Sequence, residues 1–134
     1  MILPFEYYDP KSIPQFVDIS LAQKDYQILA GGTDLLVKMR NGNTNCSVID
    51  IKKLDIPEIK DVVLKENGLW IGSLSSFTKI KNDNVIKEKF LALSEAASVM
   101  GCFEIRNRAT IGGTICTAGS GAEAGDRKST RLNS

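Results

Sequence analysis

Apolar and polar positions divide the first half of the chain into short strands and helices. Residues 5–8 alternate and predict an opening strand, while residues 12–23 have apolar side chains at helical spacing behind a Ser12 N-cap. Residues 26–30 are a short apolar run typical of a buried strand, and residues 46–51 form a second β-prone run. This part of the chain therefore predicts a β-α-β arrangement.

The second half of the chain predicts a hairpin followed by helices. Two β-prone runs, 60–65 and 69–74, flank Glu66-Asn67-Gly68, and Asn-Gly between such runs is a strong hairpin signal. A helix capped by Ser75 or Ser76 is expected through Ile80, and a longer helix over about residues 90–100. The expected fold class is α+β, built as two small α/β subdomains.

Length, composition and charge fit an ordinary globular chain. The 134 residues are 43% hydrophobic, and 17 basic residues balance 16 acidic ones to a net charge of +1. This balance creates no general field for nucleic acid or an anionic membrane. No apolar run approaches the ~20 residues that span a bilayer, and the first residues lack signal-peptide character. We therefore expect a cytoplasmic protein without a membrane span.

The cysteine spacing and the absence of histidine exclude several kinds of site within this chain. Cys46, Cys102 and Cys116 form no C-x-x-C pair, so a zinc or iron–sulfur site held by this chain alone is not expected. Without histidine, Ser-His and Cys-His nucleophilic catalysis are excluded as well. We expect three free, mostly buried thiols, no metal, and no catalytic acid, base or nucleophile.

Two Gly-Gly motifs are the candidates for a binding site. The first, residues 29–36, places Gly31 and Gly32 at the end of a strand, where Thr33 or Asp34 can cap the next segment. The second is residues 110–114. Glycine permits positive φ and close approach to the backbone, and successive free N–H groups form a nest for phosphate. Two such turns suit the adjacent phosphates of a dinucleotide, although each could be a plain structural corner.

Known nucleotide fingerprints do not describe these motifs. Neither matches G-x-G-x-x-G or G-x-x-x-x-G-K-[ST], so a Rossmann or P-loop site is disfavoured. The pair instead resembles the FAD-binding subunit of molybdenum hydroxylases, the medium subunit of xanthine, nicotinate and carbon-monoxide dehydrogenases. The resemblance rests on Ala30-Gly31-Gly32-Thr33-Asp34-Leu35, on Ile105-Arg106-Asn107 and on Ala109-Thr110-Ile111-Gly112-Gly113, in the family's order and separation.

The resemblance implies a fold and its subdomains. It extends from Phe5 to about Gly125 and implies the p-cresol methylhydroxylase-type FAD-binding fold. Residues 1–55 would be an N-terminal FAD-binding subdomain, residues 56–125 the start of an incomplete second one, and residues 126–134 a tail outside the family. That tail looks like translated sequencing-adapter sequence joined to a truncated reading frame, and we expect it to be frayed.

The resemblance also implies the cofactor-binding residues. The first motif would wrap the FAD pyrophosphate through its backbone, and the second would hold the flavin from the other side. Gly101, expected to end the preceding helix, and Glu123, where the family usually has aspartate, would also contact FAD. Thr114 replaces the usual asparagine but keeps a hydroxyl. The implied set is Leu29, Ala30, Gly31, Gly32, Thr33, Asp34, Leu35, Leu36, Gly101, Thr110, Ile111, Gly112, Gly113, Thr114 and Glu123.

The function implied is that of a flavoprotein oxidoreductase subunit. It would relay electrons from iron–sulfur clusters to FAD and on to NAD or another acceptor, beside a molybdopterin-binding large subunit and a [2Fe-2S] small subunit. Because family members continue well beyond residue 125, we expect the chain alone to be inactive and to bind FAD weakly. Two alternatives remain open: an assembly module without flavin, and a regulatory domain for another nucleotide.

Overall fold

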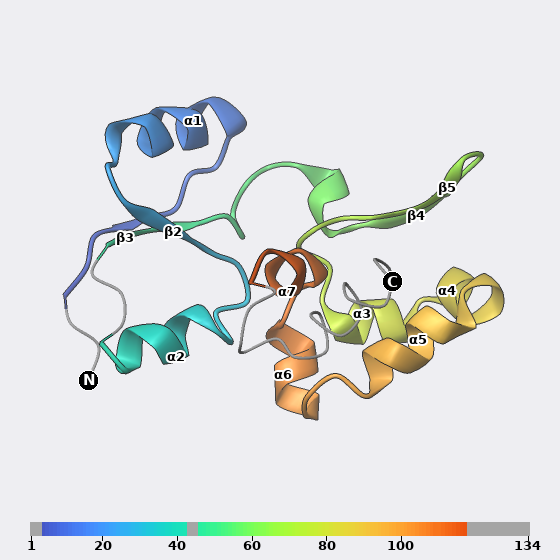
Figure 1. The fold of residues 1–134 in the computed structure, drawn as a ribbon. Helices are drawn as coiled ribbons and strands as arrows, with labels where there is room; N and C mark the ends of the chain where they lie inside the picture. The colour runs from blue at the N-terminus through green and yellow to red at the C-terminus, as the bar shows by residue number, and fades with distance from the viewer. Residues whose placement is uncertain (1–3, 43–45, 118–134) are drawn as a thin grey trace, which may run out of the picture. The chain divides into compact units, whose positions relative to one another are not determined.

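The computed structural model describes residues 4–42 and 46–117, and its contacts divide the chain into two compact units. Unit 1 comprises residues 1–57 and unit 2 residues 58–134. Each unit combines helices with strands (Figure 1), and the described residues form one sheet in each unit. The expectation of a mixed α and β fold is therefore confirmed.

Unit 1 is a parallel sheet with crossover helices. Its strands β1 (Tyr7–Tyr8), β2 (Tyr26–Leu29) and β3 (Ser47–Asp50) have the order β1-β3-β2. Helix α1 (Ile13–Ala22) follows β1, helix α2 (Leu35–Arg40) follows β2, and the two helices lie on opposite sides of the sheet (Figure 1). Parallel strands require such crossovers, and right-handed crossovers running in opposite directions place their helices on opposite faces.

In unit 1 a local signal sets the start of α1, and the position of each strand in the sheet sets its burial. The Ser12 hydroxyl accepts a hydrogen bond from the Gln15 N–H at 3.3 Å, which confirms the predicted N-cap of α1. Val48 and Ile49 of the central strand β3 are buried, as expected for a strand with neighbours on both edges. The prediction that β2 is a buried strand is wrong, because β2 is an edge strand and Ile28 remains 40% exposed.

Unit 2 begins with a short 3₁₀ helix and a hairpin. The 3₁₀ helix η1 (Pro57–Lys60) precedes the antiparallel strands β4 (Val62–Lys65) and β5 (Gly68–Ile71). The predicted hairpin is confirmed, with Lys65 opposite Gly68 and Glu66-Asn67 as its two-residue loop. The helices that follow are α3 (Phe77–Asn82), α4 (Asn84–Lys89), α5 (Leu91–Ser98), α6 (Phe103–Arg108) and α7 (Ile111–Thr117).

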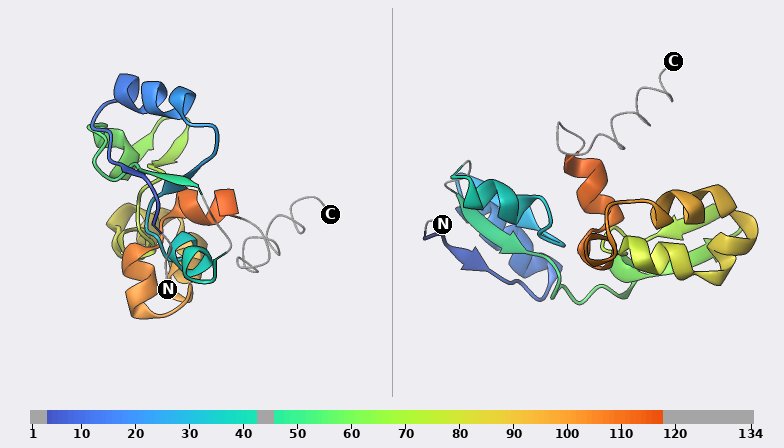
Figure 2. Two further views of the ribbon diagram at one scale, coloured as in Figure 1. Left: turned by 90° about the vertical axis from the view of Figure 1, so that its left-hand side faces the viewer. Right: turned by 90° about the horizontal axis from the view of Figure 1, so that it is seen from below.

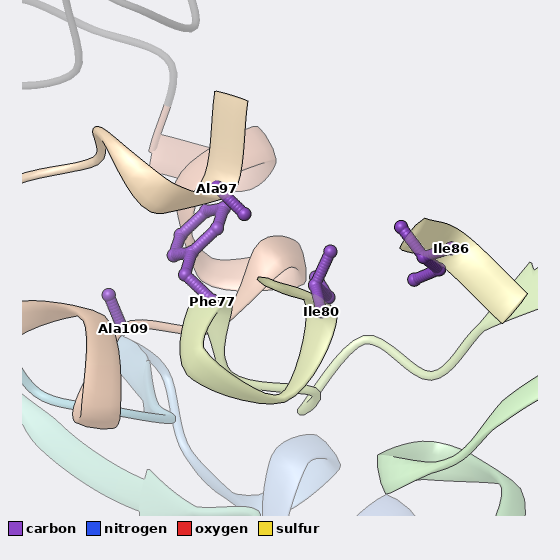
Figure 3. Close-up of a cluster of buried hydrophobic side chains, with 5 residues drawn as sticks. All are labelled: Phe77, Ile80, Ile86, Ala97 and Ala109. Carbon is purple, nitrogen blue, oxygen red and sulfur yellow. The ribbon is translucent and has the colours of Figure 1, made fainter. Parts of the chain in front are cut away.

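One apolar cluster holds the helices of unit 2 together (Figure 3). It comprises Phe77, Ile80, Ile86, Ala97 and Ala109. Partly buried side chains of the hairpin pack against this cluster, and the helices lie over one side of the hairpin (Figure 2). Because burial stabilises at about 25 cal/mol per Å² of apolar surface, this shared core fixes the short helices against the two strands.

All helices in the described ranges are short, and none is long and apolar enough to cross a membrane. Of the two serines that could cap α3, Ser76 is the cap: its hydroxyl accepts from the Lys79 N–H at 3.1 Å. Helix α5 lies within the predicted residues 90–100, but Gly101, at a φ of +58°, follows the C′ position instead of occupying it. Helices α4, α6 and α7 have no predicted counterpart, because six or seven residues are too few to show a period.

Replacing Ser76 with alanine should destabilise unit 2 by about 1 kcal/mol, because the Lys79 N–H loses its acceptor. Urea unfolding followed by Trp70 fluorescence measures the loss. Ser73→Ala is the matched control, since the Ser73 side chain is exposed and takes part in no hydrogen bond within the described ranges. Equal unfolding midpoints for the two variants would show that the cap contributes nothing.

Candidate functional site

The first Gly-Gly motif connects β2 to α2 in unit 1. Gly32 has a φ of +78°, a left-handed conformation that other residues avoid. A Cβ on Gly32 would lie 3.0 Å from Cδ1 of Leu36 and 3.2 Å from Cδ1 of Leu29. The turn therefore needs glycine at Gly32 for its backbone conformation, whereas a Cβ there would require only small shifts of the Leu29 and Leu36 side chains.

Several backbone N–H groups of this motif lack an acceptor. Within the described residues, the N–H groups of residues 32–35 donate no hydrogen bond, whereas the Leu36 N–H donates to the Gly32 carbonyl at 3.1 Å. The first N–H groups of a helix have no partner inside it, so they require a side chain, water or a ligand. The motif thus presents consecutive donors beyond the carboxyl end of a parallel strand, where open α/β sheets bind anionic ligands.

Asp34 stands at the N-cap position of α2 but does not cap the helix. Its φ and ψ of −105° and −47° are helical, whereas a capping residue is extended, and its side chain makes no cap hydrogen bond. The carboxylate instead pairs with Lys38 at 3.2 Å, one turn along. Thr33 also makes no side-chain hydrogen bond within the described residues. The prediction that Thr33 or Asp34 caps this segment is therefore wrong.

A buried carboxylate lies beside the entry to the motif. Asp50, the last residue of β3, is 3% exposed. Its Oδ2 accepts from the Tyr7 hydroxyl at 2.6 Å and lies 3.1 Å from Lys52 Nζ, while its Oδ1 accepts from the Lys52 N–H at 2.9 Å. The Lys52 ammonium also donates to the Ala30 carbonyl at 3.0 Å. These contacts link the ends of all three strands of unit 1.

Sequence reasoning missed Tyr7, Asp50 and Lys52. The available signal was an aspartate at the carboxyl end of a strand whose other residues are apolar, because a charge there needs partners if it is buried. Its partners lie 43 residues away at Tyr7 and only two residues away at Lys52. Only the pairing of β1 with β3 identifies the first of them.

The pKa values of this cluster follow from its hydrogen bonds. Burial raises the pKa of Asp50, but the hydrogen bonds from Tyr7 and Lys52, with the Lys52 charge, together bring it below its ordinary value. The hydrogen bond to Asp50, followed by burial and the charges of Asp50 and Asp9, raises the pKa of Tyr7 to about 12. At neutral pH the carboxylate is charged and the phenol is neutral, so Tyr7 is the donor.

The second Gly-Gly motif forms the start of helix α7 in unit 2. The Gly113 N–H donates to Oγ1 of Thr110 at 3.1 Å, and the Thr114 N–H donates to the Thr110 carbonyl at 3.1 Å. The N–H groups of Ile111 and Gly112 donate to the carbonyls of Ser75 and Ser73, at 3.1 and 2.9 Å. The expectation that this motif offers free N–H groups to a phosphate is therefore wrong.

Gly112 serves close packing within unit 2. A Cβ on Gly112 would lie 2.7 Å from both the Cβ and the carbonyl oxygen of Ser73. Among the described residues, a Cβ on Gly113 would meet only Oγ1 of Thr110, at 2.9 Å. An isolated bridge also pairs Ser76 with Thr110. The second motif therefore allows the start of α7 to lie directly against the segment that follows β5.

The remaining predicted site residues are Gly101, Thr114 and Glu123. Gly101 has a positive φ, and a Cβ there would lie 2.9 Å from Cγ2 of Ile105, so its own loop requires glycine. Thr114 is half-buried in α7. Glu123 and the tail of residues 126–134 lie outside the described residues.

The cysteines are free but not mostly buried, so that part of the prediction is wrong. Cys102 and Cys116 are exposed, and only Cys46 is partly buried. Burial, followed by the charge of Asp25, raises the pKa of the Cys46 thiol. Among the described residues, no group of three histidine, cysteine, aspartate or glutamate side chains could hold a metal ion.

Comparison with known proteins finds a matching family over most of the chain. The sequence model of the family described as "FAD binding domain in molybdopterin dehydrogenase" matches residues 3–125. A nicotinate dehydrogenase FAD-subunit from Eubacterium barkeri is 40% identical over 126 residues, covering 90% of this chain and 42% of that protein. A xanthine dehydrogenase FAD-binding subunit from Escherichia coli O157:H7 is 32% identical over 120 residues, covering 88% and 40%. The chain thus spans about two fifths of the length of these curated relatives.

Solved structures give a corresponding picture of the fold. Carbon monoxide dehydrogenase from Hydrogenophaga pseudoflava, in a form that lacks the Mo-pyranopterin moiety of the molybdenum cofactor, matches with a TM-score of 0.78 at 31% identity. The match covers 86% of this chain and 40% of that chain. Quinoline 2-oxidoreductase from Pseudomonas putida 86 matches with a TM-score of 0.83 at 23% identity, covering 91% and 42%, which shows likeness of fold alone.

Replacing Tyr7 with phenylalanine should lower the free energy of unfolding at neutral pH by about 1 kcal/mol, because Asp50 loses a donor. The folded pKa of Tyr7 is raised to about 12, so its contribution is complete below the ordinary value near 10 and lost between about 10 and 12. The stability difference between the two proteins should therefore shrink over that range. Urea unfolding at several pH values measures it, and a constant difference would contradict the assignment.

Gly112→Ala should destabilise unit 2 by about 1–3 kcal/mol, because the new Cβ overlaps the Ser73 backbone. Gly113→Ala is the matched comparison at the next position of the same helix. Among the described residues its Cβ meets one side-chain oxygen of Thr110 and no backbone atom, so its loss should be smaller. Urea unfolding compares the two variants, and an equal or reversed order would show that close packing does not explain Gly112.

Proposed function

The chain belongs to the family of FAD-binding domains of molybdopterin dehydrogenases, as the resemblance implied, and we propose that its first Gly-Gly motif binds the diphosphate of FAD. One observation carries this proposal: the N–H groups of residues 32–35 have no acceptor among the described residues, beside a glycine at a φ of +78°. A diphosphate requires several such donors with little side-chain bulk between them. The residues present therefore fit the cofactor.

The other contacts with FAD are proposed as follows. Along Leu29 to Leu36 the backbone would face the diphosphate, which needs no charged side chain. For Gly101, residues 110–114 and Glu123 the proposal rests on the resemblance alone. Since the N–H groups of residues 111–114 already have acceptors, contact there would use apolar surface or the Thr114 hydroxyl.

We further propose that the chain is part of a flavoprotein oxidoreductase subunit in the cytoplasm. When bound, FAD would carry electrons from iron–sulfur clusters to NAD or another acceptor. The proposed partners are a molybdopterin-binding large subunit and a [2Fe-2S] small subunit. The names of the relatives support this, since they are FAD subunits of nicotinate and xanthine dehydrogenases. Because the chain spans about two fifths of those proteins, activity and partners belong to the proposal.

The same proposal includes the subdomains. Residues 1–55 would be the N-terminal subdomain of the p-cresol methylhydroxylase-type FAD-binding fold, and residues 56–125 the start of the second. Two observations support these bounds: the contacts divide the chain after residue 57, and the family match ends at residue 125. Residues 126–134 would lie outside the family.

Replacing Gly32 with valine should abolish FAD binding, because a β-branched side chain resists positive φ and blocks approach to the donors. Titration of the 134-residue chain with FAD, followed by backbone amide NMR, should shift the signals of residues 31–35 in the wild-type protein. Binding is expected to be weak in this chain and tight, with yellow protein, when family-like sequence continues after Gly125.

Gly42→Val is the matched control for that experiment. Gly42 has a φ of +75°, close to that of Gly32, but no atom of the described residues lies within 4 Å of its Cβ position. The two variants therefore share the backbone strain and differ in location. Equal FAD affinity in both variants would contradict the assignment of the first motif. Absence of flavin binding in the wild-type and extended proteins would favour the assembly module instead.

A further inference from the structure

We propose that Lys52 is a positioning residue for the first Gly-Gly motif. Its ammonium, held by Asp50, fixes the Ala30–Gly31 peptide and thereby the path by which the chain enters the donors of residues 32–35. The inference rests on the proposed function and deepens it, because it assigns a role to a side chain outside both motifs.

Lys52 holds one peptide group at the entry to the motif. Lys52 Nζ donates to the Ala30 carbonyl oxygen at 3.0 Å. In a planar trans peptide the carbonyl and the following N–H point in opposite directions. Holding the Ala30 oxygen toward Lys52 therefore fixes the direction of the Gly31 N–H. It also fixes the point from which the chain enters Gly32.

The motif is held at both ends. At its entry, the Ile51 N–H donates to the Leu29 carbonyl at 3.1 Å, so residues 51 and 52 engage two successive carbonyls. At its exit, the Leu36 N–H donates to the Gly32 carbonyl at 3.1 Å. The donors between these anchors are ordered before any ligand arrives, which lowers the entropy cost of binding.

Lys52 acts by orienting the peptide and not by attracting the diphosphate with its charge, because Asp50 compensates that charge. Lys52 Nζ lies 3.1 Å from Oδ2 of Asp50, whose side chain is 5% exposed and also accepts a hydrogen bond from the Tyr7 hydroxyl. Because the two opposite charges lie so close together, their fields largely cancel at the more distant position of a diphosphate. Lys52 therefore adds little net attraction for a diphosphate, and its main effect is to fix the peptide that it contacts.

The test compares Lys52→Met with Lys53→Met. Lys53 is the next residue and is exposed. Its Nζ lies 2.8 Å from Oδ2 of Asp9, which is not part of the first Gly-Gly motif. Without ligand, Lys52→Met should change the amide NMR signals and speed the hydrogen exchange of residues 31–34, and Lys53→Met should not. FAD affinity should fall about tenfold in Lys52→Met only. Lys52→Arg, which keeps the charge and the donors, should restore most of it.

Removing Lys52 leaves the buried carboxylate of Asp50 without its cation, which can destabilise the fold. The double variant Asp50→Asn with Lys52→Met removes both charges and is expected to lose FAD affinity while remaining folded. Unchanged amide signals and unchanged affinity in the Lys52 variants would overturn the inference. If the wild-type chain and its extended form bind no FAD, the proposed function fails. The ligand-free amide signals still test the anchoring of the motif by itself.

Discussion

The buried carboxylate of Asp50 is the constraint on which unit 1 depends. A charge that is 3% exposed must be surrounded by donors and cations, since an unpaired buried charge costs several kcal/mol. Tyr7 supplies the hydroxyl donor from β1, and Lys52 supplies the cation just beyond β3. The same cation holds the Ala30 carbonyl at the end of β2. One charge therefore links β1 to the carboxyl ends of β2 and β3, where the candidate site lies.

The two Gly-Gly motifs are similar in sequence but differ in the hydrogen bonds of their backbone N–H groups. In both, the glycine pair follows an apolar residue and lies just before or within the first turn of a short helix. In unit 2 the carbonyls of Ser73 and Ser75 and the Thr110 side chain and carbonyl accept every N–H from residue 111 to residue 114. In unit 1 no described group does so for residues 32–35. Backbone N–H groups need hydrogen-bond acceptors. The oxygens of an anionic cofactor can supply the acceptors that the first motif lacks.

This arrangement suits recognition by backbone and not by charged side chains. The net charge of +1 provides no long-range attraction, and Lys38 is paired with Asp34 while Lys52 contacts Asp50. Neutral donors in fixed positions bind a phosphate at short range and depend on preorganisation. Anchoring of the turn by long-range contacts therefore has direct consequences for affinity, which is why a residue outside the motif can influence the proposed site.

The sequence by itself determined the features that neighbouring residues control. These are the cap at Ser12, a serine cap before α3, the hairpin around Asn67-Gly68, the β-α-β arrangement of unit 1, and the family. The tertiary structure alone decided that Asp50 is buried against Tyr7 and that Lys52 reaches Ala30. It also decided that the second motif uses its donors internally. Caps and tight turns form within a few residues, so local sequence specifies them. The partners of Asp50, Lys52 and Gly112 include groups 22 to 43 residues away, and only the pairing of strands and the packing of helices brings those groups within hydrogen-bonding distance.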